Sequence, residues 1–131
     1  METAAKAQVG SDGRRALGDV GEALVARYFQ ERGAEVVAQN WRRQEGELDL
    51  VVREPDGVIV AVEVKTRRSL GYGEPVEAVT AAKQARLRRL VGVWLRENPA
   101  VRAAGVRLDV VGVLIRPDER PRLRHVTGVG A

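Results

Sequence analysis

Two apolar runs separated by a Pro-Asp-Gly turn constrain the fold of this chain more than any other feature. One run follows Asp49 and the other precedes Glu63. Apolar, β-prone runs around such a turn predict a β-hairpin. If residues 54–57 form the loop, Asp49 lies opposite Val62, and with one more loop residue it lies opposite Glu63. In either register the two carboxylates lie near each other at one end of the hairpin.

Lys65 is expected to join these two acids. Residues two apart on a strand share a face, so Lys65 projects on the same side as Glu63. Two carboxylates a few ångströms apart repel each other unless a cation lies between them. A solvated hairpin edge is the alternative interpretation, because Glu-x-Lys is common there. The apolar residues that alternate along residues 58–64 favour a site next to buried surface.

The two acids and the lysine provide the groups that phosphodiester cleavage needs. Such cleavage requires a metal that polarises the phosphate and generates hydroxide, and a cation near the developing charge. We expect Asp49 and Glu63 to bind Mg²⁺ or Mn²⁺ through their oxygen atoms. Lys65 would orient or deprotonate the attacking water, or stabilise the phosphorane.

A glutamate on the first predicted helix is a further candidate ligand. Apolar spacing predicts this helix over residues 15–32, with Gly33 as its C-cap. Glu22 lies mid-helix, and its neighbours at helical spacing, Gly18 and Ala26, are small. Small residues would let the helix approach another element closely and aim Glu22 into the site. The alternative is an ordinary exposed helical glutamate.

The rest of the chain alternates between strands and one further helix. The pattern predicts a second helix over residues 77–95 and strands over residues 35–38, 106–115 and 123–126. Together with the hairpin, this order predicts an α/β domain with a central mixed β-sheet flanked by α-helices. We place this single domain at residues 15–126, after a disordered lead-in over residues 1–14 and before a flexible tail over residues 127–131.

Composition excludes several other classes of protein. No apolar stretch approaches the roughly 18 residues that a membrane helix needs, and the sequence opens without a secretory signal. Without cysteine there is no disulfide, zinc-thiolate site or thiol nucleophile, and the expected location is cytoplasmic. His125 is the only histidine and is assigned no role, and Asp109, inside a strand, is expected to be structural.

The charge balance permits binding to nucleic acid. The net charge is +4, and arginine, which binds phosphate bidentately, far outnumbers the three lysines. A genome rich in G and C would also favour arginine codons. Trp41 would stack on a base or belong to the core. The expected nucleic-acid contacts, each of which could instead be a solvated or packed side chain, are Arg42, Thr66, Arg67, Tyr72, Lys83, Gln84 and Arg86.

Five motifs resemble the YraN-like family of small bacterial proteins. They are Gly21-Glu22, Asn40-Trp41-Arg42, Gly46-Glu47-Leu48-Asp49-Leu50, Val62-Glu63-Val64-Lys65-Thr66-Arg67 and Glu77-Ala78-Val79-Thr80-x-x-Lys83-Gln84. The match runs over about residues 15–113. The combination is specific, although no single motif is.

The YraN-like family is similar to the restriction-endonuclease-like superfamily, also called PD-(D/E)xK nucleases, and to archaeal Holliday junction resolvases. The resemblance implies catalytic roles for Glu22, Asp49, Glu63 and Lys65, with Gln84 as a supporting residue. In those resolvases a glutamate of the first helix joins the sheet carboxylates. Glu47-Leu48-Asp49 stands where the superfamily name has Pro-Asp, which is a common departure.

The leading hypothesis is therefore a Mg²⁺-dependent endonuclease that acts on branched or structured DNA. A monomer of this size can cut one strand, and symmetric cutting of a junction would require a homodimer. A non-catalytic nucleic-acid-binding module is the first alternative, and it would not need the full set of acids and lysine. A protein-interaction adaptor is the second, and it would need an exposed apolar patch.

Overall fold

Five strands form one mixed sheet in the order β1-β2-β3-β4-β5. The computed structural model describes residues 11–69, 71 and 73–130. Strands β3 and β4 are parallel, and the other neighbouring pairs are antiparallel. The predicted α/β class, with a central mixed sheet flanked by helices, is confirmed. The elements in chain order are α2 (Ser11–Glu31), β1 (Glu35–Arg43), β2 (Gly46–Arg53), β3 (Val58–Arg67), the 3₁₀ helix η1 (Pro75–Ala78), α3 (Ala81–Glu97), β4 (Gly105–Leu114) and β5 (Arg122–Val126).

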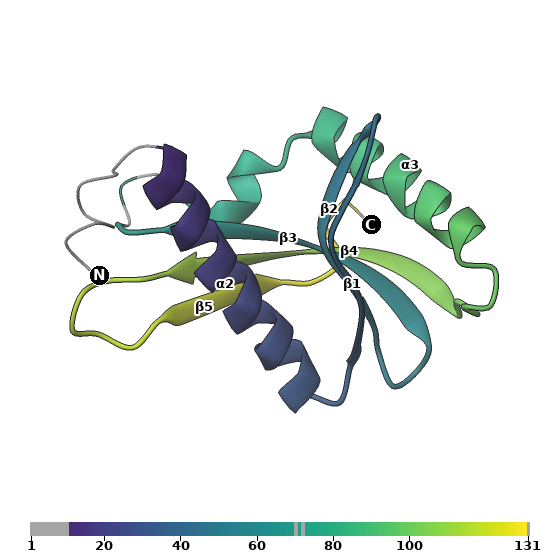
Figure 1. Ribbon diagram of the computed structural model, residues 1–131, viewed down its shortest axis with the longest axis horizontal. Coiled ribbons are helices and arrows are strands. Elements are labelled where there is room, and N and C mark those ends of the chain that lie inside the picture. The colour runs from purple at the N-terminus through teal and green to yellow at the C-terminus, as the bar shows by residue number, and fades with distance from the viewer. Residues whose placement is uncertain (1–10, 70, 72, 131) are drawn as a thin grey trace.

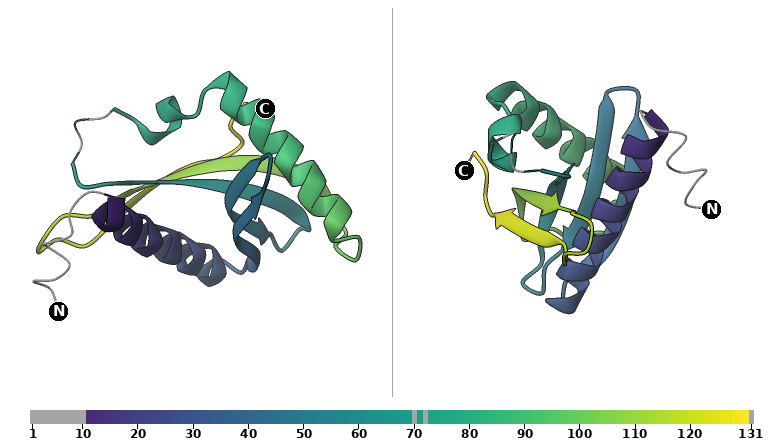
Figure 2. Two further views of the ribbon diagram at one scale, coloured as in Figure 1. Left: turned by 45° about the horizontal axis from the view of Figure 1, so that its top comes forward. Right: turned by 90° about the vertical axis from the view of Figure 1, so that its left-hand side faces the viewer.

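The two long helices cover opposite faces of the sheet (Figures 1 and 2). Side-chain alternation along β3 explains this arrangement, because Val60 and Val62 pack in the α2 core while Ile59 and Ala61 pack in the α3 core. A central strand buried on both faces must be apolar at nearly every position. That requirement makes the charged residues at the end of β3 conspicuous.

The β2–β3 hairpin has the second of the two predicted registers. Leu50 is paired with Val62, so the next position brings Asp49 opposite Glu63. The loop is closed by a hydrogen bond from Glu54 N to Val58 O of 2.9 Å. Gly57 has a φ of 88°, a left-handed conformation that glycine adopts without strain. The extra loop residue therefore decides which residue faces Asp49.

Several predicted boundaries are corrected by local hydrogen bonds. Helix α2 begins at Ser11, inside the segment expected to be a disordered lead-in, whose first ten residues lie outside the described structure. Strand β1 extends to Arg43 because it forms a second hairpin with β2. The predicted helix over residues 77–95 divides into η1 and α3, since Thr80 caps α3 by accepting a hydrogen bond from Lys83 N.

Residues 127–130, where the sequence predicts a flexible tail, pack against the domain in the structure. Val129 is buried in the α3 core and donates its N–H to Leu108 O at 2.8 Å. Arg88, on α3, donates to the carbonyl of Val129 at 3.2 Å. Backbone pairing and burial together hold this segment beside the sheet.

A buried ion-pair network ties β4 to its neighbours. Asp109 is 1% exposed and accepts hydrogen bonds from Arg107, from the backbone N–H of Gly128 and from the ring of His125. Burial alone would raise the pKa of Asp109, but these hydrogen bonds outweigh it and hold the pKa below its usual value. The ring of His125 also contacts the Tyr28 hydroxyl of α2 at 2.9 Å. The structural role expected for Asp109 agrees with this network, whereas the sequence indicated no partner for His125.

Helix α2 approaches β3 closely at Gly21. A Cβ at this position would overlap the Thr66 side chain. We expect Gly21→Ala to lower the free energy of unfolding by about 1–3 kcal/mol, because the overlap forces helix and strand apart. Chemical denaturation measures the change. Gly18→Ala is the matched control: a Cβ there meets nothing within 4 Å, so this variant should be neutral or more stable by about 0.5–1 kcal/mol. Equal losses in the two variants would contradict the close contact.

Candidate active site

The site lies where two neighbouring strands separate. Strands β2 and β3 are paired from Leu50 to Arg53. In the part of β2 that precedes Leu50, the strand diverges from β3 together with β1, whereas β3 continues beside β4 (Figure 1). Asp49 is the first residue of β2 beyond that pairing. Its Oδ2 atom accepts a hydrogen bond of 2.9 Å from the backbone N–H of Val64. The divergence of the strands therefore opens space beside an anchored carboxylate.

Two lysines share the second carboxylate. Glu63 is only 7% exposed, and its Oε2 atom lies 3.1 Å from Lys65 Nζ and 2.6 Å from Lys83 Nζ. Lys65 shares the face of β3 with Glu63, as the alternation predicts. Lys83 comes from the first turn of α3, next to the Thr80 cap. The sequence predicts Lys83 only as a nucleic-acid contact and not as a partner of Glu63. Its position three residues after a threonine that can cap a helix indicates that it lies in the first turn of α3.

Asp49 and Glu63 differ in how far nearby cations compensate their negative charge. Burial, and then the charge of Glu63, raise the pKa of Asp49 to about 7, and the hydrogen bond from Val64 opposes this only in part. Burial would lower the pKa of Lys83, but its hydrogen bond to Glu63 and the charges of Glu63 and Asp49 together outweigh burial, and the pKa is raised. The lysines thus neutralise Glu63, while Asp49 forms no ion pair with any of the described cations and is influenced by Lys83 only at longer range.

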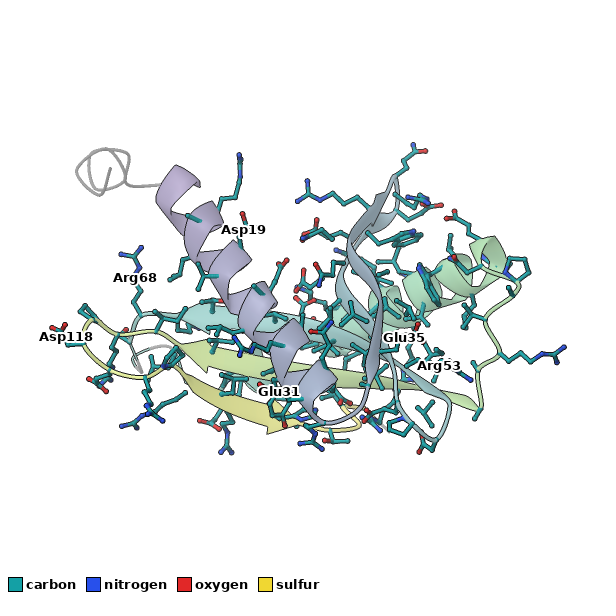
Figure 3. All side chains as sticks on the ribbon, turned by 60° about the horizontal axis from the view of Figure 1, so that its bottom comes forward. Asp19, Glu31, Glu35, Arg53, Arg68 and Asp118 are labelled. Carbon is teal, nitrogen blue, oxygen red and sulfur yellow. The ribbon has the colours of Figure 1, made fainter. Side chains whose placement is uncertain are left out.

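Glu22 extends the cluster from the other side of the sheet. Its Oε1 atom is buried and has no hydrogen-bond partner in the described part of the chain. Burial raises the pKa of Glu22, and the Asn40 side chain lowers it in part by hydrogen bonding. The charge of Glu22 also contributes to the raised pKa of Asp49. Figure 3 shows side-chain oxygen atoms gathered between α2 and the β1–β2 hairpin.

The predicted close packing of the first helix exists, but not at the predicted glycine. Gly21 makes the contact with β3, whereas a side chain at Gly18 would meet open space. Ala26 is buried, as expected. Gly21 immediately precedes Glu22, so the contact between Gly21 and Thr66 fixes the position of Glu22 along β3.

The carboxylates fit a divalent cation only in part. Within residues 11–69, 71 and 73–130, no group of three or more acidic or histidine side chains is already gathered around one point. However, Mg²⁺ is commonly bound by one or two carboxylates together with water and substrate phosphates. Asp49 and Glu63 provide such a pair, and the unpartnered Oε1 of Glu22 adds an oxygen nearby. The donor set therefore fits Mg²⁺ or Mn²⁺ held jointly by these carboxylates, water and substrate phosphates, and not an ion held by the protein alone.

A basic surface continues from the site along α3. A cavity of about 190 Å³ lies at the site, and the side chains that line it include Asp49, Glu63, Lys83 and Arg86. Arg86 also lines a neighbouring hollow of about 490 Å³, together with Arg89 and Arg96. The cavity and the hollow therefore adjoin at Arg86, and arginines outnumber the one acid, Glu45, in the described lining of the hollow.

The other predicted contact residues are scattered. Thr66 faces Gly21 of α2, and the Gln84 amide donates to Val79 O at 3.1 Å, so both are engaged in packing. Arg42 forms an exposed ion pair of 2.9 Å with Glu47. Tyr72 lies outside the described residues. The packing of Thr66 and Gln84 argues against a DNA contact for either side chain, while the contacts predicted for Arg42, Arg67, Lys83 and Arg86 stay predictions.

Two further side chains near the site have structural or solvated positions. Trp41 packs against the α3 core and lies under the Arg43 guanidinium, 4.6 Å from the ring centroid, so the structure favours the core role over stacking on a base. Arg68 is exposed and projects away from the protein (Figure 3), as a solvated loop residue would.

The fold and the site together define the class of this protein. A five-stranded mixed sheet between helices, with an Asp, a Glu and a Lys grouped where the central strands part, is the restriction-endonuclease-like arrangement. None of the helices in the described residues is long and apolar enough to cross a membrane.

The chain belongs to the uncharacterised protein family UPF0102, whose model matches residues 21–113. The predicted YraN-like membership is thereby confirmed. A UPF0102 protein of Rhodococcus opacus (strain B4) is 50% identical over 111 residues, which cover 85% of this chain and 92% of the relative. One of Nocardia farcinica (strain IFM 10152) is 47% identical over 116 residues, covering 88% and 90%. One of Acidothermus cellulolyticus is 46% identical over 125 residues, covering 88% and 93%.

Proposed function

We propose that this protein is a metal-dependent endonuclease that acts on branched or structured DNA. One observation carries the proposal: Asp49, Glu63 and two lysines meet beside a cavity that opens onto the arginines of α3. Buried acids without full neutralisation destabilise a fold, so their presence at one point indicates function. The resemblance to resolvases supports branched DNA as the substrate.

Each residue has a distinct task in this proposal. Asp49 and Glu63 would hold Mg²⁺ or Mn²⁺, with Glu22 completing the site. The cation would supply positive charge for the phosphate as its negative charge grows during hydrolysis. Lys65 would orient the attacking water or stabilise that developing charge. Arg86 and the other arginines of α3 would hold the DNA backbone.

The decisive experiment combines cleavage with metal binding. Purified protein is incubated with junction, flap, nicked, single-stranded and duplex DNA in Mg²⁺, Mn²⁺ or EDTA. Cleavage should require the divalent ion and favour the branched forms. Calorimetry should show that the Asp49→Asn, Glu63→Gln double variant no longer binds the ion. Metal binding that is unchanged in the double variant would place the ion elsewhere.

A non-catalytic nucleic-acid-binding module is the second candidate. The ion pairs of Glu63 with Lys65 and Lys83 favour it, because they neutralise one acid without any metal. This candidate becomes the better account if the protein binds DNA but cuts none of the five forms. If the protein bound none of the five DNA forms, the protein-interaction adaptor would become the better account.

A further inference from the structure

A second hollow lies at the end of β3, beyond Lys65 and away from the position that faces Asp49, and its lining includes Gly112, the β4 residue paired with Lys65. It has a volume of about 310 Å³, at the lower end of the range of roughly 300–1,000 Å³ found for small-ligand sites. Strand register explains its composition, because paired residues on neighbouring strands point to the same face. Two successive rows cross the sheet here, Lys65–Gly112–Arg124 and Arg67–Leu114–Arg122.

The hollow has an apolar floor between basic walls. Gly112 and Leu114 form the floor, and Arg67 lies on one side, with Arg122 and Arg124 on the other. Pro75 packs directly on Gly112, where a Cβ would overlap its ring, so the proline forms part of the apolar floor. The only acid in the described lining is Glu74, which pairs with Arg124, so that lining is net positive.

This combination suits one nucleotide better than a length of duplex. A base can lie against leucine, proline and guanidinium planes while an arginine binds its phosphate. A base inside a duplex is stacked on its neighbours and hydrogen-bonded to its partner. It therefore cannot enter a hollow that is closed at the bottom. The two rows lie about 7 Å apart along β3, which is close to the spacing of neighbouring phosphates in an extended strand.

We propose that the hollow holds an unpaired nucleotide next to the phosphate at Lys65, so that the preferred substrate has single-stranded DNA on that side of the cut. This inference rests on the proposed function, because it assumes that DNA reaches the Asp49–Glu63–Lys65 site. It adds a determinant of substrate preference to the proposed function. The arginines of β5, which are far from the acids in sequence, select for an unpaired strand.

The test measures DNA binding in a Lys65→Ala background, which should prevent cutting. Two labelled DNAs of equal length are compared by fluorescence anisotropy, a full duplex and a splayed fork. The fork should bind about tenfold more tightly, the order expected for one stacked nucleotide. Arg122→Glu should remove most of this preference, and its exposed side chain with only a 3.9 Å contact to Glu119 makes the change tolerable for folding. A 2-aminopurine at the first unpaired position should change fluorescence on binding only when Arg122 is present.

Arg120→Glu is the matched control, because Arg120 is exposed in the β4–β5 connection, two residues before Arg122, and does not line the hollow. It should keep the preference for the fork. Equal affinity for fork and duplex, or equal effects of the two charge reversals, would overturn the inference. Wild-type cleavage without a fork preference would overturn it and leave the nuclease proposal standing. A fork preference that depends on Arg122 without cleavage would support it and reject the nuclease proposal alone.

Discussion

Lys65→Ala is expected to lower the rate of DNA cleavage by at least about 10²–10³-fold, the loss typical when one group that stabilises transition-state charge is removed. DNA affinity should change little, because one lysine at the cleavage centre contributes little to ground-state binding beside the arginines of α3. Single-turnover rates and anisotropy separate the two effects.

The structure explains why this variant should still fold. Glu63 is nearly buried, and a buried carboxylate that loses its cationic partner destabilises a protein strongly. In Lys65→Ala, however, Lys83 still lies 2.6 Å from the same carboxylate oxygen. The stability of Lys65→Ala should therefore stay close to that of the wild type.

Lys83→Ala is the informative comparison. It leaves Lys65 at 3.1 Å from Glu63 and in place for catalysis. We expect a smaller loss of cleavage than in Lys65→Ala, because Lys83 acts on Glu63 and not on the reacting water. If Lys65→Ala cuts as fast as the wild type, the catalytic role proposed for Lys65 is wrong, although the fold assignment would remain.

Asp49→Asn is expected to make the protein more stable above neutral pH while it abolishes cleavage. The pKa of Asp49 is raised from 3.8 to about 7 in the folded protein, first by burial and then by Glu63. A raised pKa means that the folded state favours the protonated acid. The stabilisation from that proton is complete below the unfolded-state pKa and is lost as pH rises through about 7.

The ionised carboxylate consequently destabilises the fold at pH 8. We expect Asp49→Asn to raise the free energy of unfolding there by about 1–3 kcal/mol, since each pKa unit corresponds to about 1.4 kcal/mol and the asparagine oxygen can still accept from Val64. The gain should shrink towards pH 4. Urea denaturation across this range measures it, without and with Mg²⁺, which should stabilise only the wild type.

Asp118→Asn is the control for this pH series. Asp118 is an exposed residue of the β4–β5 connection with a φ of 62°, a conformation that asparagine also adopts readily. Its substitution should leave stability unchanged at every pH. A stability gain for Asp118→Asn equal to that for Asp49→Asn would attribute the effect to net charge and not to the site.

Local signals along the chain were enough to predict several elements. The Pro-Asp-Gly turn between apolar runs predicted the hairpin, and the two-residue period placed Lys65 on the face of Glu63. The Lys65–Glu63 ion pair of 3.1 Å agrees with that period. The order of the strands and helices was enough for the α/β class. Boundaries were less predictable, because single hydrogen bonds such as the Thr80 cap set them.

Which distant residues meet was settled by tertiary packing alone. Strand pairing could not choose between Val62 and Glu63 as the partner of Asp49, because one loop residue shifts the register and turns every side chain to the other face. The second lysine at Glu63 comes from α3, the glycine that lets α2 approach β3 is Gly21, and two arginines that line the second hollow come from β5. These contacts depend on how the helices and strands pack across a sheet. The spacing of residues along the chain does not determine that packing.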